Sequence, residues 1–203
     1  MRTALVQSHD GRTIAPDLTQ TLARAATGEE GAWRELVALY GRRVFALARS
    51  RVGGDEAAEE IAQSVFATIA IKLREGGYSE QGRFEPWLFR IAMNRIRDAV
   101  RHAKRRSGTV ALDGSPEPSF ESNDGPSGHA ERVALRGAIE RLSDADREII
   151  ELRHHAGMGF KEMAELLDEP VGTLLARHHR ALRKLREMLG PVIEDQEESE
   201  GES

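Results

Sequence analysis

The chain has 203 residues, a formal net charge of −5 and no cysteine. This length suits one ordinary domain or two small ones, and the lack of cysteine excludes disulfides and thiolate metal sites. No apolar run reaches the roughly 18 residues that span a bilayer, and the N-terminus lacks the apolar core of a secretion signal, so we expect a cytoplasmic protein without a membrane segment. Aromatic residues make up 5% of the chain, while alanine, leucine, arginine and glutamate dominate. This composition predicts an all-α fold.

The first half of the chain predicts four helices. Residues 1–16 show no clear periodicity, and we expect them to form a mobile arm. The pair Gly53-Gly54 separates the second predicted helix from the third, and Asp55 suits the N-cap of the third. Apolar residues recur at helical spacing within each of the longer helices. The predicted helices cover residues 17–26 and 30–51, the stretch that follows Asp55 and ends at the break Gly76-Gly77, and residues 84–104.

The second half opens with a different composition. Between residues 107 and 129, glycine, proline and serine make up 12 of 23 residues, which is typical of a flexible linker. Helical periodicity then returns, and Ser143 with Asp146 resembles a capping box. We therefore predict two small helical domains joined by a flexible linker, the second domain containing a helix-turn-helix. The predicted segments are an arm (1–16), a first domain (17–106), the linker (107–129), a second domain (130–190) and an acidic tail (191–203).

Basic side chains are concentrated in parts of the chain, although the whole is acidic. Between Arg83 and Arg106 there are eight basic residues against two acids, Glu85 and Asp98. Residues 194–203 carry six acids and no base. Such asymmetry favours a nucleic-acid partner for one face of the molecule. The acidic tail either aids solubility or folds back over an arginine-rich helix.

The segment from Phe160 to Leu189 is expected to form two helices that break at Asp168-Glu169-Pro170. A short helix, a tight turn and a basic helix form the layout in which the second helix enters the DNA major groove. An arginine-rich helix face that is merely solvated is the alternative. Residues placed to reach base edges are Thr173, Ala176, Arg177, His179 and Arg180, and Arg183 and Lys184 would contact phosphates.

The predicted fourth helix places aromatic residues before a basic face. Tyr78, Phe84, Trp87 and Phe89 lie close in sequence to several arginines. Aromatic rings beside cations can stack on unpaired bases, each stack contributing roughly 1–3 kcal/mol. The alternative is that Trp87 and Phe89 belong to the hydrophobic core. An outward-facing Asn94 among the arginines could hydrogen-bond a base edge.

Other polar clusters give no sign of catalysis or of a metal site. The acids of the third helix, Asp55 to Glu60, are explained either by the helix dipole or by docking of a basic partner. His154-His155 and His178-His179 are adjacent pairs, and neighbours on a helix point about 100° apart, so neither pair chelates a metal alone. No nucleophile with a base and no glycine-rich phosphate loop is present. We therefore expect no enzyme activity, no cofactor and no metal.

Three motifs together resemble a bacterial RNA polymerase sigma factor of the extracytoplasmic-function group. Ala58-Glu-Glu-Ile-Ala-Gln-Ser-Val-Phe66 resembles the acidic motif on the family's polymerase-binding helix. Phe84-Glu-Pro-Trp-Leu-Phe-Arg-Ile-Ala-Met-Asn94 resembles the family's most specific motif. Glu165-Leu-Leu-Asp-Glu-Pro-Val-Gly-Thr173 resembles the turn before its recognition helix. The resemblance covers roughly residues 20–106 and 130–189.

The resemblance implies partners and a division of labour. The first domain would bind core RNA polymerase, at the clamp coiled coil of β′ and also the β subunit, and would capture an unstacked base of the promoter −10 element. The second domain would read the −35 element, and an anti-sigma factor is a further candidate partner. The implied polymerase-binding residues are Glu59, Glu60, Gln63 and Phe66. The implied −10 DNA-binding residues are Tyr78, Arg83, Arg90, Asn94, Arg95, Arg97 and Arg101, and the −35 residues are those named above for the second domain.

The chain departs from the family pattern at several positions. Glu60 replaces the usual Asp, and Ser64 replaces Glu, so the polymerase-binding face carries one carboxylate fewer. Leu175 and Ala176 stand where a basic residue and a serine are usual, so two polar contacts to the −35 element are missing. His178 occupies a usually apolar position, and we expect it to be partly buried and neutral.

Two other classes of protein would share part of this pattern. An ordinary transcription regulator has the helix-turn-helix but needs no polymerase-binding domain. A helical adaptor that does not bind DNA would show no salt-sensitive affinity for it.

Overall fold

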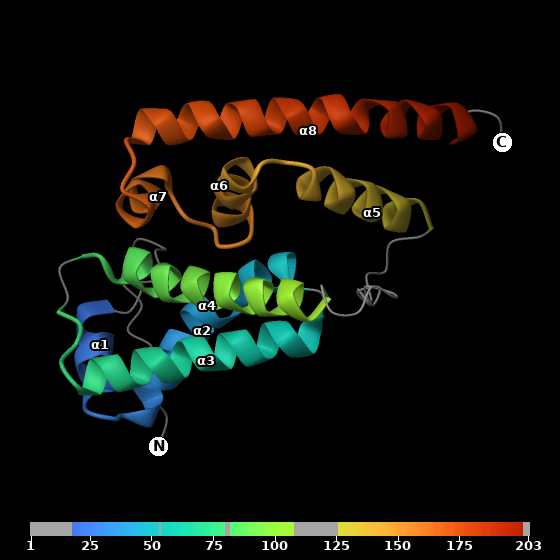
Figure 1. Cartoon of the computed structure of the whole chain (residues 1–203). Coiled ribbons are helices and arrows are strands. Elements are labelled where there is room, and N and C mark those ends of the chain that lie inside the picture. Colours follow the sequence, from blue (N-terminus) through green and yellow to red (C-terminus); the bar gives the residue numbers. More distant parts are fainter. Residues whose placement is uncertain (1–17, 53, 80–81, 108–125, 201–203) are drawn as a thin grey trace, which may run out of the picture.

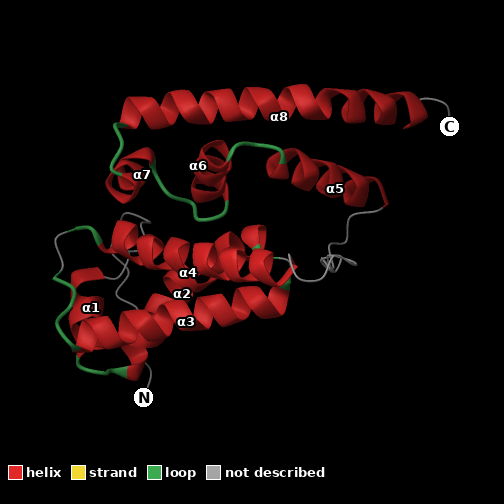
Figure 2. Cartoon of the chain, viewed as in Figure 1, coloured by secondary structure: helices red, strands yellow, loops and turns green. Residues whose placement is uncertain are grey.

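The computed structural model describes residues 18–52, 54–79, 82–107 and 126–200. These residues form α-helices and short connections, with no strand among them, as predicted (Figure 2). The helices are α1 (Leu18–Ala26), α2 (Glu30–Arg51), α3 (Asp55–Arg74), α4 (Phe84–Ser107), α5 (Pro126–Glu140), α6 (Asp144–His154), α7 (Phe160–Leu167) and α8 (Val171–Glu200). The predicted arm and most of the predicted linker lie outside the described residues.

The N-terminal domain consists of α1 to α4. Helices α2, α3 and α4 pack on one another, and α1 lies against α2 and α3 (Figure 1). Each long helix contributes one apolar stripe, with Leu36, Val65 and Leu88 among the fully buried side chains. Apolar residues at helical spacing bury one side of each helix and leave the opposite side to water. The exposed sides of α3 and α4 are therefore available for partners.

The C-terminal domain consists of α5 to α8. Helix α8 is the long rod along one side of this domain, and α5, α6 and α7 all pack on it (Figure 1). Leu174 and Ala181 of α8 are fully buried, as are Ile149 and Met163 of the helices facing it. The helix-turn-helix pair α7–α8 is thus supported by α5 and α6.

The break between α7 and α8 falls where the sequence predicts it. Asp168 ends α7 in the left-handed conformation, with a φ of 56°. Aspartate tolerates this conformation better than most residues, and Pro170 cannot continue a helix because it lacks the N–H donor. The N–H of Glu169 donates to the carbonyl of Ala164 at 3.2 Å, which satisfies one of the last acceptors of α7.

Two predicted helix caps have different outcomes. The Ser143 hydroxyl accepts the N–H of Asp146 at 3.2 Å, which confirms Ser143 as the N-cap of α6. The Asp146 carboxylate binds the Lys184 ammonium of α8 at 2.6 Å. The prediction for Asp55 is wrong, because α3 starts at this residue and Gly54 is its N-cap. Asp55 instead forms an ion pair with Arg49 across the bend between α2 and α3.

Two predicted boundaries also move. Helix α5 starts at Pro126, inside the predicted linker, because proline is well suited to the first turn of a helix. Helix α8 continues to Glu200, whereas the sequence analysis treats residues 191–203 as a tail. Glutamate is a good helix former, so an acidic segment can extend a helix that already exists. The acidic segment runs onward along α8 rather than back over its basic part (Figure 1).

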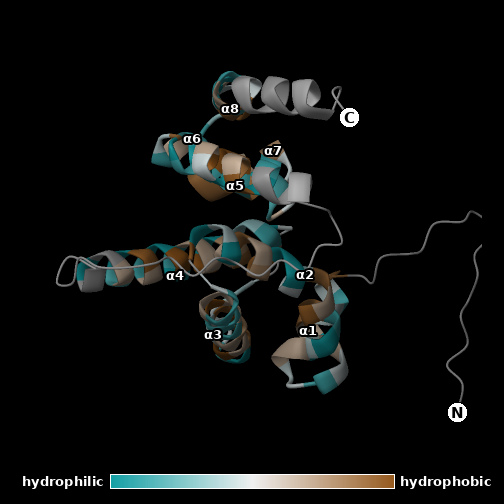
Figure 3. Cartoon of the chain, turned by 90° about the vertical axis from the view of Figure 1, so that its right-hand side faces the viewer, coloured by the Kyte–Doolittle hydropathy of each residue, from teal (hydrophilic) through white to brown (hydrophobic). Residues whose placement is uncertain are grey.

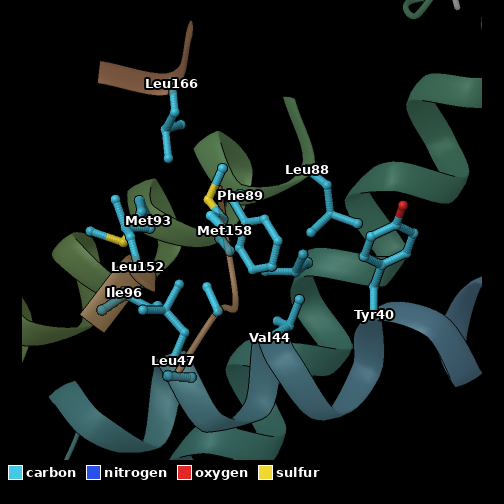
Figure 4. Packing of buried hydrophobic residues seen from close by; sticks show 14 of the residues in the cluster. Tyr40, Val44, Leu47, Leu88, Phe89, Met93, Ile96, Leu152, Met158 and Leu166 are labelled. Atoms are coloured by element: carbon cyan, nitrogen blue, oxygen red, sulfur yellow. The ribbon is translucent and has the colours of Figure 1, made fainter. Parts of the chain in front are cut away.

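The two domains are in contact, which the sequence analysis did not predict. In both views, α5 to α8 lie above α1 to α4 (Figures 1 and 3). Helix α7 packs on α4, and α6 approaches α2. The apolar cores of the two domains meet at this boundary (Figure 4).

Candidate nucleic-acid interface

The outer side of α4 carries the polar residues predicted to bind single-stranded DNA. Leu88, Phe89, Ala92 and Ile96 of the same helix are buried. The exposed residues of the predicted set on this helix are Arg90, Asn94, Arg95, Arg97 and Arg101. Helical periodicity therefore separates the core residues from the candidate contacts, as the sequence predicts.

The aromatic residues around the start of α4 form one cluster. The rings of Tyr78 and Trp87 lie 4.4 Å apart between centroids, and Tyr78 meets the edge of Phe84 at 5.5 Å. Phe89 is buried, so the core explanation is correct for this ring, and Trp87 packs against the core while only partly buried. Phe84 is buried as well. Tyr78 and Trp87 are half-buried. Both rings pack against the core and leave part of their surface accessible.

Several candidate DNA-binding groups on α4 face the C-terminal domain. One Arg90 nitrogen donates to the carbonyls of Glu165 and Leu166, at 2.9 and 3.1 Å. Arg97 forms an ion pair with Glu148 of α6. Asn94 is exposed, yet it lines a cavity whose opposite wall includes Leu166 and Leu167 of α7.

The other predicted cations of this group make weaker or local contacts. Arg83 lies 3.5 Å from the Glu165 carboxylate, and both side chains are exposed. Arg95 donates to the Thr68 hydroxyl of α3 at 3.0 Å. Arg101 pairs with Asp98 one turn earlier. Exposed pairs of this kind contribute roughly 0–1 kcal/mol, so a phosphate can replace the acid at little cost.

The predicted polymerase-binding residues lie together on α3. Glu59, Glu60 and Gln63 are exposed, while Ala58, Ile61 and Val65 are buried on the opposite side. Phe66 is half-buried and packs against the core. The exposed acids therefore form a continuous surface next to one partly accessible ring. The helix dipole also favours acids at this end of α3.

Helix α8 divides its polar residues between solvent and the protein. Thr173, Ala176, His179, Arg180 and Arg183 are exposed, as a helix that enters the major groove requires. Arg177 instead makes two hydrogen bonds to the Glu169 carboxylate, at 2.9 and 2.6 Å. Lys184 binds Asp146. Two of the predicted DNA contacts are thus already bound to acids of their own domain.

A histidine of α6 and a histidine of α8 lie in contact with each other. The Nε2 atoms of His154 and His178 lie 3.2 Å apart, and the edge of Phe160 packs on His178. Burial, together with the positive charge of nearby His154, His179 and Arg153, lowers the pKa of His178. His178 is half-buried, as expected, and the direction of the pKa shift favours its neutral form. Within the described ranges no three metal-binding side chains gather.

The structure also reveals a buried ion pair that the sequence analysis missed. Glu151 of α6 is fully buried and accepts from Arg51 of α2, 100 positions away in the sequence. In the sequence it stands between Ile150 and Leu152 and resembles an ordinary helical glutamate. No periodicity identifies its partner, because the partner belongs to the other domain.

Comparison with known proteins assigns both domains. The family model described as Sigma-70 region 2 matches residues 36–106, which cover most of α2 and all of α3 and nearly all of α4. The model described as Sigma-70, region 4 matches residues 132–185 in the C-terminal domain. The match to region 2 argues against an ordinary regulator that has only a helix-turn-helix.

Proteins of similar sequence match this chain along most of its length. The RNA polymerase sigma factor CarQ of Myxococcus xanthus is 31% identical over 84% of this chain and 97% of its own. The ECF RNA polymerase sigma factor SigE of Mycolicibacterium smegmatis is 30% identical over 91% of this chain and 74% of its own. The solved structure of CnrH in complex with the cytosolic domain of CnrY is 25% identical, with a TM-score of 0.65 over 85% of this chain and 97% of that one.

No helix in the described part of the chain is long and apolar enough to cross a membrane. The two matched regions occur in the order expected for a sigma factor, and the polar faces of α3, α4 and α8 belong to those regions. The chain therefore belongs to the extracytoplasmic-function group of the sigma-70 family, and it directs promoter-dependent initiation of transcription by RNA polymerase.

Proposed function

We propose that this sigma factor acts through three separate surfaces. The exposed acids of α3, with Gln63 and Phe66, bind the clamp coiled coil of the polymerase β′ subunit. The outer side of α4 binds the opened −10 strand, and the exposed side of α8 reads the −35 duplex. The observation that carries this proposal is the placement of exposed Asn94 between Arg90 and Arg97 on one side of α4.

The chemistry of the α4 surface suits an unpaired strand. Arginines neutralise phosphates, and an asparagine amide can both donate to and accept from a base edge. Taking a base out of the stack costs a few kcal/mol, so the accessible parts of Tyr78 and Trp87 must compensate by stacking. An exposed amide with nearby rings meets both requirements.

On α8, the exposed residues nearest the helix start set the −35 contacts. Thr173, Ala176, His179 and Arg180 face solvent there, while Arg177 is held by Glu169. Leu175 is also exposed, at 37% of its surface. Ala176 and Leu175 offer apolar contacts where the family pattern has polar ones, and a thymine methyl is the major-groove feature that apolar side chains contact.

A further proposed partner is an anti-sigma factor in the cytoplasm. The similar protein CnrH is known in complex with the cytosolic domain of CnrY. Several surfaces of this chain are apolar and exposed, among them Val37 and Leu39 of α2, at 47% and 42%. Such residues can be covered by a protein partner.

The proposal is tested by transcription from genomic DNA with purified core polymerase and this chain. Sequencing of the transcript starts identifies both promoter elements. Replacing Asn94 with alanine should reduce promoter opening roughly 10–100-fold, because a base contact contributes about 1–3 kcal/mol. Binding to core polymerase should stay unchanged.

The matched control is His102→Ala, which changes an exposed residue of the same helix outside the proposed contact set. It should open promoters like the unmodified chain. Normal opening by Asn94→Ala would remove Asn94 from the proposed site. Transcription no more selective than that of core polymerase alone would refute all three surfaces.

A further inference from the structure

Two histidines that are 24 positions apart in the sequence face each other where α6 packs on α8. His154 is the last residue of α6, and His178 lies in the first half of α8. Their Nε2 atoms are 3.2 Å apart, whereas the centroids of the two rings are 5.4 Å apart. The planes of the rings differ by only 20°. The two rings therefore turn their Nε2 edges toward each other.

The fold combines these histidines in a way that their order in the sequence does not. Neighbours on a helix point about 100° apart, so neither His154-His155 nor His178-His179 chelates a metal alone. Packing of α6 on α8 instead brings one member of each adjacent pair to the same place. Each pair considered by itself gave no reason to expect a metal, but the pair formed across the two helices does.

The separation of the two nitrogens suits two ligands of one metal ion. Histidine nitrogens bind Zn²⁺ at roughly 2.0–2.1 Å, so two of them at an angle of about 90–109° lie roughly 2.8–3.4 Å apart. The observed 3.2 Å falls within this range. Nitrogens that point at each other must turn outward to share an ion, and His154 can turn because its side chain is exposed.

The surroundings hold one histidine in place and leave the other accessible. The Phe160 ring packs edge-on against half-buried His178, with 5.4 Å between the centroids. Exposed His154 ends α6, where the helix dipole favours a cation. Arg153 opposes this effect, because its guanidinium lies 5.3 Å over the same Phe160 ring and adds a positive charge. A cation can therefore enter from solvent, and it must bind imidazole well to overcome the nearby arginine.

We propose that His154 and His178 form a two-nitrogen site for a divalent transition metal ion such as Zn²⁺, Ni²⁺ or Cu²⁺, which links α6 to α8. These ions favour imidazole, whereas Mg²⁺ and Ca²⁺ favour oxygen ligands. In the described part of the chain no third metal-binding side chain joins the pair, so water completes the coordination. Neither histidine belongs to the three surfaces proposed above, so the site is independent of them.

The test measures Zn²⁺ binding to the full-length chain by calorimetric titration at neutral pH. His154→Ala removes one ligand and should lower the affinity at least tenfold, and His178→Ala should do the same. The matched control is His102→Ala, which removes an exposed histidine of α4 and should leave the affinity unchanged. Mg²⁺ in place of Zn²⁺ should not compete for the site.

Thermal unfolding gives a second measurement, because an ion that binds only the folded chain stabilises it. Saturating Zn²⁺ should raise the Tm of the unmodified chain and of His102→Ala, but not that of His154→Ala or His178→Ala. The increase is measured within each variant, so a variant that is less stable without metal still gives a valid comparison. Equal Zn²⁺ affinity in the unmodified chain and both ligand variants would refute the site. The contact would then be a hydrogen bond between two imidazoles only. An equal rise in Tm with Mg²⁺ would likewise refute it, since such binding would not depend on histidine.

Discussion

Glu151 illustrates what burial does to a single ion pair. Its Oε2 atom accepts from Arg51, while Oε1 is buried with no partner in the described part of the chain. Burial raises the pKa of Glu151 to about 7, against the opposing effect of Arg51 and Arg147 and with a small contribution from Glu148. The free-energy cost of removing the Glu151 carboxylate from water therefore exceeds its favourable interaction with the two arginines. The ion pair fixes geometry rather than adding stability at neutral pH.

This pKa predicts how stability depends on pH. Because the pKa of Glu151 in the folded chain lies above its ordinary value, its contribution is fully present below pH 4.5 and is lost as pH rises through 7. Glu151→Gln cannot ionise, so it should be more stable than the unmodified chain at pH 8, by about 2–4 kcal/mol at 1.36 kcal/mol for each pKa unit. At pH 5 the two chains should differ little.

Urea unfolding at both pH values measures the difference. Glu140→Gln makes the same change at an exposed position of α5 and should show no such dependence on pH. A constant stability difference between Glu151→Gln and the unmodified chain from pH 5 to 8 would show that Glu151 does not titrate in this range.

At the scale of elements, α8 combines two tasks in one helix. Leu174, Ala181 and Leu185 hold it against the domain, and its opposite side is exposed. The bidentate contact from Glu169 ties Arg177 to the turn that precedes the helix. Arg180 is exposed and makes no hydrogen bond or ion pair within the described residues. Arg180 is therefore a free cation on this exposed side, about one turn after Ala176 and two turns after Thr173.

The two arginines should respond differently to substitution. Arg180→Ala should weaken binding to the promoter duplex by roughly 1–3 kcal/mol if it contacts a base, and should leave stability unchanged. Arg177→Ala should mainly lower the free energy of unfolding, because Glu169 loses its partner. Anisotropy with promoter and unrelated duplexes separates specific from non-specific loss. An Arg177→Ala chain of normal stability that binds the promoter poorly would reverse these assignments.

Most elements could be predicted from local patterns, since a helix is determined by residues close together in sequence. The range 30–51 and the break at Asp168 follow from apolar spacing and from breaker residues, and the structure confirms both. The prediction for Asp55 is wrong because α3 begins at Asp55 itself, after Gly54 as N-cap, and the Asp55 carboxylate pairs with Arg49 at the end of α2. Contacts such as Arg43 with Ala156 join residues 113 positions apart. The spacing of residues within one helix does not indicate a contact between distant parts of the chain. The polar face of α4 could therefore be predicted from the sequence, but the packing of the C-terminal domain on α4 could not.

At the scale of the whole molecule, each domain buries apolar side chains of the other. These side chains would be exposed to water if the domains separated. Phe89, Met93 and Met158 would face water in a separated chain. Polymerase or DNA must therefore provide enough binding energy to replace this contact. A ligand shifts a conformational equilibrium only by its difference in affinity for the two states. The contact between the two domains thus lowers the apparent affinity of any ligand that needs the side of α4 on which α7 packs.

The shared boundary predicts a cooperative thermal transition. We expect domains that share a buried apolar contact to unfold together, so calorimetry of the unmodified chain should show one transition. Met158→Asp should divide it into two, with the small C-terminal domain melting first. Loss of about 2 kcal/mol of apolar burial should lower the Tm of that domain by roughly 8–16 °C, because a domain of this size shifts by about 4–8 °C per kcal/mol. Leu135→Asp should keep the single transition, since it lies outside the boundary. Two transitions already present in the unmodified chain would mean that the domains unfold independently, and the contact would then be too weak to keep α4 covered.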